Sequence, residues 1–226
     1  MSEQEMQEAP FVVSVQVGTV APLGPEAVPS GFVKSPVEGP IGAGKLGLEG
    51  DQQADLRVHG GPEKAVYAYA ASNYPAWLKE FPEHRRRLVP GAFGENLTIE
   101  GISEADLCVG DIHSIGTALL QVCQPRQPCF KFGLHFEDKR MPRAMVRNGR
   151  AGWYYRVIEP GALQAGDEVL LVERPHPDLP FQRLIEIVNR GEAADTELVR
   201  LASAKGVASW IQAAAKEALV ARLSTL

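Results

Sequence analysis

The chain has 226 residues, of which 45% are hydrophobic and 23% are charged, and its formal net charge is −5. This composition is typical of a soluble chain with one good-sized domain or one domain plus a small appendage. The negative charge argues against a nucleic-acid partner. No apolar run reaches the roughly 20 residues that would span a bilayer, so no membrane segment is expected.

Residues 1–10 are mostly acidic and polar, without the basic start and apolar core of a secretory signal, and we expect a disordered lead-in. Residues 11–174 then read as short apolar runs separated by glycine and proline, which is typical of strands and turns. The strand candidates lie at 11–20, 66–70, 97–99, 112–115, 118–123, 153–158 and 168–173. Many short strands with tight Gly-Asp corners favour a closed β-barrel or a sandwich.

Two helices are predicted within this strand-rich part. The first covers about residues 72–81, and Ser72 is suited to its N-cap. The second covers about residues 141–148, where Pro142 suits the first turn and Gly149 suits the C-terminal stop. The fold predicted for this domain is therefore mainly β with added α-helices.

The pattern changes in the last quarter of the chain. Prolines at 175, 177 and 180 predict a stiff linker, and apolar residues then recur at helical spacing in three runs. We therefore expect a second domain at 175–226 that forms a small three-helix bundle. From about residue 180 onward it has no cysteine and no histidine. Its expected roles are packing, a homodimer contact or the docking of a partner, and not chemistry.

The three cysteines are Cys108, Cys123 and Cys129. Their odd number and wide spacing argue against a disulfide framework, a zinc ribbon and an iron–sulfur cluster. A reducing, cytoplasmic location fits them best. Cys108 and Cys123 lie in or beside apolar strands, which predicts buried and inert thiols.

Cys129 differs because it lies in the polar loop QPRQPCFK at 124–131, which two prolines stiffen. The cations of Arg126 and Lys131 are close in sequence, and nearby cations favour the thiolate. A thiolate is the form that binds a metal or attacks an electrophile. The sequence therefore predicts that Cys129 is a functional cysteine, although a buried, inert thiol is the common alternative.

Three further segments offer groups for binding. His59 precedes Gly60 and Gly61, whose backbone can approach a ligand closely and aim N–H groups at an anion, while His59 could donate to a ligand or cap the turn. Asn96 can both donate and accept hydrogen bonds to a heterocycle, or it lies in a plain turn. Lys34 is either a partner of an anion or a solvated lysine. These segments alone leave both interpretations open.

Six motifs occur in a defined order along the chain. They are GLEGD at 47–51, HGG at 59–61, FGENL at 93–97, VGD at 109–111, QVCQPRQPC at 121–129 and GWYYRVIEPG at 152–161. Together they resemble the MOSC family, specifically its YiiM-like branch. The C-terminal helices are similar to the three-helix extension of that branch, so the resemblance covers nearly the whole chain. It implies a MOSC-type closed β-barrel at 11–174.

The resemblance also implies a molybdenum cofactor, in which a pterin dithiolene holds the metal. Cys129 occupies the position of the cysteine in the family's PRxPC motif. The resemblance therefore implies that Cys129 is the metal-binding and catalytic residue. A cysteinate is a suitably soft additional ligand for this metal. Arg126, with Lys34 and Arg57, would pair with the phosphate of the cofactor. In the implied site, the backbone of Gly60 and Gly61 and the amide of Asn96 would hold the pterin, and His59 would orient the thiolate.

The activity implied by the resemblance is the reduction of small N-hydroxylated compounds such as 6-hydroxylaminopurine. The metal would carry the redox chemistry, and the protein would bind and orient the substrate. Because the chain has no iron–sulfur cysteines, a separate electron-donating reductase is expected as a partner. Two alternatives remain open. In the first, the chain carries sulfur as a persulfide on Cys129, or carries the cofactor with Cys129 as a ligand. In the second, the chain is a non-catalytic binding module.

Overall fold

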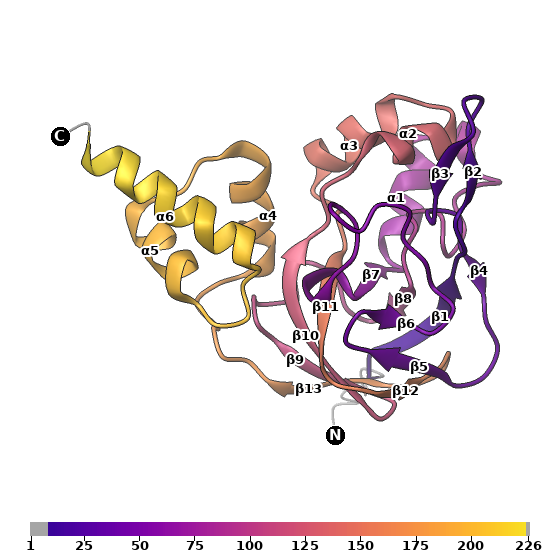
Figure 1. Ribbon diagram of the computed structural model, residues 1–226, viewed down its shortest axis with the longest axis horizontal. Helices are drawn as coiled ribbons and strands as arrows, with labels where there is room; N and C mark the ends of the chain where they lie inside the picture. Colours follow the sequence, from indigo (N-terminus) through magenta and orange to yellow (C-terminus); the bar gives the residue numbers. More distant parts are fainter. Residues whose placement is uncertain (1–8, 225–226) are drawn as a thin grey trace, which may run out of the picture.

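The computed structural model describes residues 9–224, so the first eight residues of the predicted lead-in lie outside the described part (Figure 1). The helices are α1 (Asn73–Glu80), α2 (Phe130–Phe136), α3 (Arg140–Asn148), α4 (Phe181–Arg190), α5 (Asp195–Ser203) and α6 (Ser209–Leu223), with two 3-10 turns, η1 (Pro62–Lys64) and η2 (Pro82–His84). The strands are β1 (Phe11–Val17), β2 (Ala21–Leu23), β3 (Val28–Ser30), β4 (Ser35–Pro36), β5 (Ile41–Gly44), β6 (Gly47–Leu48), β7 (Val66–Ala70), β8 (Leu97–Glu100), β9 (Ile112–Ile115), β10 (Ala118–Pro125), β11 (Trp153–Glu159), β12 (Gly161–Leu163) and β13 (Val169–Glu173).

An eight-stranded mixed sheet is the framework of the molecule. Its strand order is β13-β9-β10-β11-β7-β8-β1-β4, and β7 and β8 are its parallel pair. In β11, Trp153, Tyr155 and Val157 are buried while the residues between them are more exposed. This alternation follows from the two-residue period of a strand and turns one face of the sheet toward the core.

The predicted closed β-barrel is wrong. The ladder of strands ends at β13 on one side and at β4 on the other, and these two edge strands do not pair with each other. Between the first strand and the segment that leads into β13, an isolated bridge joins Phe11 to Glu168, flanked by a few backbone hydrogen bonds. The described chain is therefore a mixed α/β fold with an open sheet, because this contact is an isolated bridge and not a continuous ladder.

Two smaller sheets lie beside the large one. Strand β5 pairs with β6 and β12, and β2 forms a hairpin with β3. Residues 42–47, GAGKLG, have the glycine spacing of a dinucleotide-binding turn, but they form the β5–β6 hairpin. Such a turn has to lead from a strand into a helix, so this segment is not a dinucleotide site.

The helices predicted at 72–81 and 141–148 are confirmed as α1 and α3, with Gly149 in the left-handed conformation at the end of α3 (φ 71°). Helix α2 was not predicted, since its sequence FKFGLHF combines aromatic residues with a central glycine, which are poor helix formers. Its buried Phe132 and Phe136 show that tertiary packing supplies the stability that local propensity lacks. Among residues 9–224, no helix has the length and apolar character to cross a membrane.

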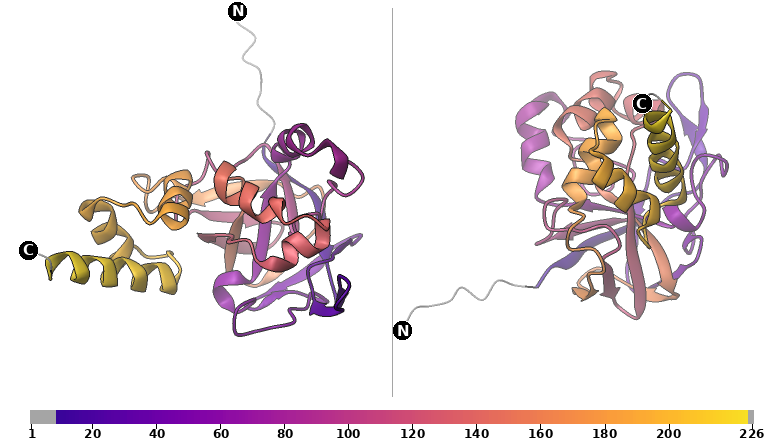
Figure 2. Two further views of the ribbon diagram at one scale, coloured as in Figure 1. Left: turned by 90° about the horizontal axis from the view of Figure 1, so that it is seen from above. Right: turned by 90° about the vertical axis from the view of Figure 1, so that its left-hand side faces the viewer.

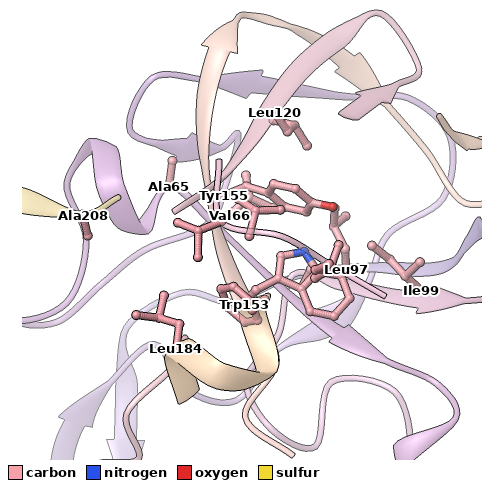
Figure 3. Packing of buried hydrophobic residues seen from close by; sticks show 14 of the residues in the cluster. Ala65, Val66, Leu97, Ile99, Leu120, Trp153, Tyr155, Leu184 and Ala208 are labelled. Atoms are coloured by element: carbon pink, nitrogen blue, oxygen red, sulfur yellow. The ribbon is translucent and has the colours of Figure 1, made fainter. Parts of the chain in front are cut away.

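Three helices do form in the C-terminal segment, but the prediction of a separate bundle is wrong. Buried side chains of α4 and α5, including Phe181, Leu184 and Leu198, belong to the same hydrophobic cluster as Trp153 and Tyr155 of the sheet. Figure 3 shows Leu184 near Trp153 and Ala208 near Ala65. The helices therefore extend the core of the sheet, although α6 projects away from it in Figure 2.

A second, aromatic cluster lies on the side of the sheet where α1, α2 and α3 gather (Figure 1). Tyr69, Trp77, Phe93 and Phe132 contact one another there, with ring centroids of Tyr69 and Phe93 4.3 Å apart. All four side chains are fully buried. This cluster anchors α2, and with it the loop that joins β10 to α2.

A core substitution tests whether the C-terminal helices unfold together with the sheet. Leu184 is 2% exposed, and replacing it by alanine should cost about 2–5 kcal/mol. We expect Leu184→Ala to lower the urea midpoint of the whole chain in one transition, seen alike by far-ultraviolet circular dichroism and tryptophan fluorescence. Val199→Ala on α5, at a 54% exposed position, is the control and should stay close to wild type. A separate early loss of helix with an unchanged fluorescence transition would contradict the shared core.

Candidate functional site

Cys129 lies between β10 and α2, where an extended loop turns into a helix. Strand β10 ends at Pro125, and Cys129 is the N-cap residue of α2 with φ −106° and ψ 170°. Its carbonyl accepts a hydrogen bond from the backbone N–H of Phe132 at 3.0 Å. The side chain is only partly buried, so its thiol is accessible from the surface.

The other two cysteines are buried, as predicted. The Cys123 thiol donates to the carbonyl oxygens of Glu63 and Tyr154 at 3.0 and 3.3 Å. Burial raises the pKa of Cys123 to about 12, and burial also raises the pKa of Cys108. Both thiols therefore stay protonated near neutral pH, which leaves Cys129 as the thiol suited to chemistry.

Cys129 opens into a surface cavity whose empty volume, with its open mouth included, is about 590 Å³. Six of the eight residues predicted from the sequence line it together, namely Lys34, His59, Gly60, Asn96, Arg126 and Cys129. They come from four segments far apart in the chain: the loop before β4, the loop before η1, the start of β8 and the β10–α2 loop.

The surroundings of Cys129 favour its thiolate. Burial by itself would raise the pKa of this thiol, but hydrogen bonding by His59, the charge of Arg126 and the backbone N–H of Lys131 together lower it to about 7. The thiolate of Cys129 is therefore favoured near neutral pH, in contrast to those of the other two cysteines. His59, which the sequence predicted to orient the thiolate, is close enough to Cys129 to act on it.

Arg126 is a buried cation, with 7% of its surface exposed. Its guanidinium donates to the carbonyl oxygen of Phe93 and lies over the rings of Phe32, Tyr67 and Phe132 at 5.1, 4.8 and 5.9 Å from their centroids. Among residues 9–224 it forms no ion pair with a carboxylate. A buried charge of this kind is costly unless an anion compensates it, so Arg126 favours a negatively charged ligand in the cavity.

Lys34 is also buried, but it has a partner that the sequence did not reveal. Its ammonium group forms an ion pair with Asp51, and the two side chains are 6% and 1% exposed. Burial lowers the pKa of Lys34, while the charge of Asp51 opposes this shift. Asp51 is held in turn by the backbone N–H of Gly18 at 2.8 Å and by the Gln53 amide at 3.2 Å. The sequence had predicted only a strand corner at Gly50-Asp51.

Two of the predicted residues lie outside the Cys129 cavity. The Arg57 side chain is 90% exposed and pairs with Asp55, so it faces solvent rather than the cavity. Gly61 lines a neighbouring groove together with Arg57, and Gly60 lines both the groove and the cavity. Gly60 and Gly61 have φ of 112° and 83°, which explains why glycines occupy both positions.

The amide of Asn96 is largely used within the protein. Its oxygen accepts from the backbone N–H of Tyr67 at 3.0 Å, and its nitrogen donates to the carbonyl of Gln16 at 3.2 Å. Asn96 therefore ties β1 and β7 together at the cavity wall, with one amide hydrogen left for a ligand. Aromatic side chains of Phe32, Tyr67 and Tyr154 complete the wall. They were not predicted from the sequence, because an aromatic residue in an apolar segment is typical of the core.

Comparisons with known proteins find similar sequences over most of the chain. The MOSC domain model matches residues 55–170. Protein YiiM of Escherichia coli (strain K12) is 38% identical over 214 residues, which are 94% of this chain and 95% of that protein. A protein of Gibberella moniliformis named Reductase is 39% identical over 166 residues, 72% of this chain but only 29% of that longer protein.

A solved structure is also similar. The crystal structure of YiiM from Geobacillus stearothermophilus has a TM-score of 0.78 and 30% sequence identity, and covers 93% of this chain and 99% of that one. The chain belongs to the MOSC domain family. Its relatives named YiiM match it over nearly their full length, so the C-terminal helices are part of what the chain shares with them.

The titration of Cys129 gives a direct test of the site. Since the thiolate is the reactive form, the rate of Cys129 alkylation by iodoacetamide should rise with pH through a midpoint near 7. His59→Ala should move the midpoint to higher pH, because it removes hydrogen bonding that favours the thiolate. Peptide mass spectrometry of the metal-free protein across about pH 5 to 9 measures both midpoints. A midpoint near the ordinary value for cysteine in the unaltered protein would contradict the described electrostatics.

Proposed function

We propose that this chain is a molybdenum-cofactor-dependent oxidoreductase that reduces N-hydroxylated compounds such as 6-hydroxylaminopurine. The observation that carries the proposal is the pairing of Cys129, whose pKa is lowered to about 7, with the buried cation of Arg126 in one cavity. A soft thiolate beside a buried cation that has no carboxylate partner among residues 9–224 suits a ligand with both a soft metal and an anionic group. Membership of the MOSC family and the relative named Reductase support the same class of activity.

The residues present fit this cofactor in charge and in the chemistry of their side chains. The cavity lining has four basic side chains, Lys34, Lys64, Arg126 and Lys131, against the single carboxylate of Asp51. This excess of positive charge suits the phosphate of the cofactor, and Arg126 can bind it through two parallel hydrogen bonds. The rings of Phe32, Tyr67 and Tyr154 offer faces against which a flat pterin can pack.

Cys129 would hold the metal through its Sγ atom, and His59 would keep that thiolate in place by hydrogen bonding. When bound, the cofactor supplies the two-electron redox chemistry. The net reaction converts N–OH, two electrons and two protons into N–H and water. Lys34 Nζ and His59 both line the cavity, so they can deliver protons as the N–O bond breaks and the oxygen leaves as water.

The electrons have to come from another protein. The three free cysteines are too dispersed for an iron–sulfur cluster, and the GAGKLG segment forms a hairpin instead of a dinucleotide site. A separate electron-donating reductase is therefore part of the proposal. Such a donor has to approach the mouth of the Cys129 cavity, because electron transfer falls off steeply with distance.

Metal and pterin content of two variants tests the cofactor site. We expect Cys129→Ser to lose molybdenum and reductase activity, because it removes the ligand. Arg126→Gln should lower cofactor content about tenfold or more, since the buried partner of the anion is gone. Arg86→Gln, at an exposed position, is the control for removing a cation and should keep the wild-type content. Mass spectrometry measures the molybdenum content, and the fluorescence of the oxidised pterin measures the pterin content, both on anaerobically purified, folded protein. Wild-type content in Cys129→Ser and Arg126→Gln would show that these residues do not hold the cofactor.

The lowered pKa of a partly exposed thiol also favours a second function, a sulfur carrier that holds a persulfide on Cys129. A cysteine desulfurase and cysteine would then load the chain with one sulfur, seen as a mass increase of about 32 Da on the peptide with Cys129 and absent from Cys129→Ser. Steady reduction of 6-hydroxylaminopurine by the loaded protein and a chemical electron donor, without a persulfide, would decide in favour of the reductase.

A further inference from the structure

A second groove lies beside the Cys129 cavity, between the Gly60-Gly61 turn and the start of α6. Residues 60–62 line it together with Arg57, Gln124 and Trp210. Gly60 and Lys64 line both the groove and the cavity, so the two hollows meet at these residues. The groove therefore lies next to the reactive thiol, and one of its walls comes from the C-terminal helices.

Trp210 is the most notable side chain in this groove because it is exposed and yet held in place. Its indole is 38% exposed, and its Nε1–H donates to the Gln124 side-chain oxygen at 2.6 Å. The Gln124 nitrogen donates in turn to the Glu63 carbonyl at 2.7 Å. An indole that is held through its polar edge has already lost rotational freedom, and more than a third of the Trp210 surface remains accessible beside the groove.

The start of α6 is fixed to the same turn by further hydrogen bonds. The backbone N–H and the hydroxyl of Ser209 donate to the Glu63 carboxylate at 3.0 and 2.9 Å. The backbone N–H of Ala208 donates to the Cys123 carbonyl at 3.1 Å. Figure 3 shows Ala208 close to Ala65, just after this turn. The indole and the glycine turn are therefore parts of one rigid unit.

The glycine turn offers hydrogen-bond donors. Within the part of the chain that the structure describes, the backbone N–H groups of Gly60 and Gly61 have no acceptor. A Cβ added at Gly61 would meet no atom within 4 Å, so open space lies beside this residue. These two adjacent N–H groups, of which that of Gly61 has open space beside it, can bind an anion or the lone pairs of ring nitrogens.

We propose that this groove binds the planar heteroaromatic base of the substrate, a purine or a similarly flat nitrogen heterocycle, with its face against Trp210. Every such base has a π-face that stacks on an aromatic side chain, and its ring nitrogens can accept from the free glycine N–H groups. Because the hollows meet at Gly60 and Lys64, an N–OH group on the base extends toward Cys129. The chemical step rests on the proposed reductase function, whereas binding of the base does not.

Binding is tested with adenine, which has the base but no N–OH group to reduce. Trp77 and Trp153 are fully buried, so Trp210 is the tryptophan of the three that a solution quencher reaches. We expect adenine to change the emission of the full-length protein saturably and to protect it from acrylamide. Equilibrium dialysis of labelled adenine should show a loss of affinity on the order of tenfold in Trp210→Ala, with partial recovery in Trp210→Phe, which retains a ring. Val220→Ala, at an exposed position on the same helix, is the control and should bind like wild type.

Turnover provides the second measurement. Trp210→Ala should lower the preference in kcat/KM for 6-hydroxylaminopurine over N-hydroxyurea on the order of tenfold, mainly through KM. Trp210-dependent binding of adenine without any turnover would support the groove and overturn the reductase. If folded Trp210→Ala still reduces the purine, and neither its KM nor its affinity for adenine changes, the proposed groove is wrong. The reductase function would then remain supported.

Discussion

The Arg126 guanidinium is buried among aromatic rings, and the site depends on the way the protein holds that charge. The guanidinium donates to the carbonyl oxygen of Phe93. The loop that carries this carbonyl is held by the buried Glu95, whose carboxylate accepts hydrogen bonds from the backbone N–H groups of Gly91 and Phe93 at 2.7 and 3.0 Å. The same carboxylate accepts the hydroxyl of Tyr74 on α1. An internal cation is costly unless every donor and neighbour is arranged around it, so α1, the 91–95 loop and the β10–α2 loop have to form together.

This constraint explains why three cysteines of one chain differ in chemistry. Cys123 lies on β10 inside the core and donates to two carbonyl groups, so its thiol is stabilised and its pKa is raised. Cys129 lies six residues further on, where the strand has ended and the Arg126 charge and His59 are close, so its pKa is lowered. Burial alone acts in the same direction on both thiols, and the neighbouring charge and hydrogen bonds decide the difference.

The C-terminal helices are part of the same construction. Their apolar side chains extend the core of the sheet, and the Glu63 carboxylate joins the start of α6 to Arg156 of β11, with its Oε1 atom 2.8 Å from the guanidinium. Glu63 directly follows the turn that carries His59, Gly60 and Gly61. A displacement of α6 would therefore shift the glycine turn through Glu63. In this way the C-terminal helices can affect the cavity although none of their residues lines it.

Local features of this chain could be predicted from its sequence. Strand alternation, the stop at Gly149 and the proline-bounded loop around Cys129 depend on neighbouring residues, and each forms as expected. Only the tertiary structure decided that the sheet is open, that α2 exists, that Asp51 pairs with Lys34 and that Trp210 borders the site. The physical reason is that these features depend on contacts between segments distant in the chain, where packing and the pairing of buried charges outweigh local propensity.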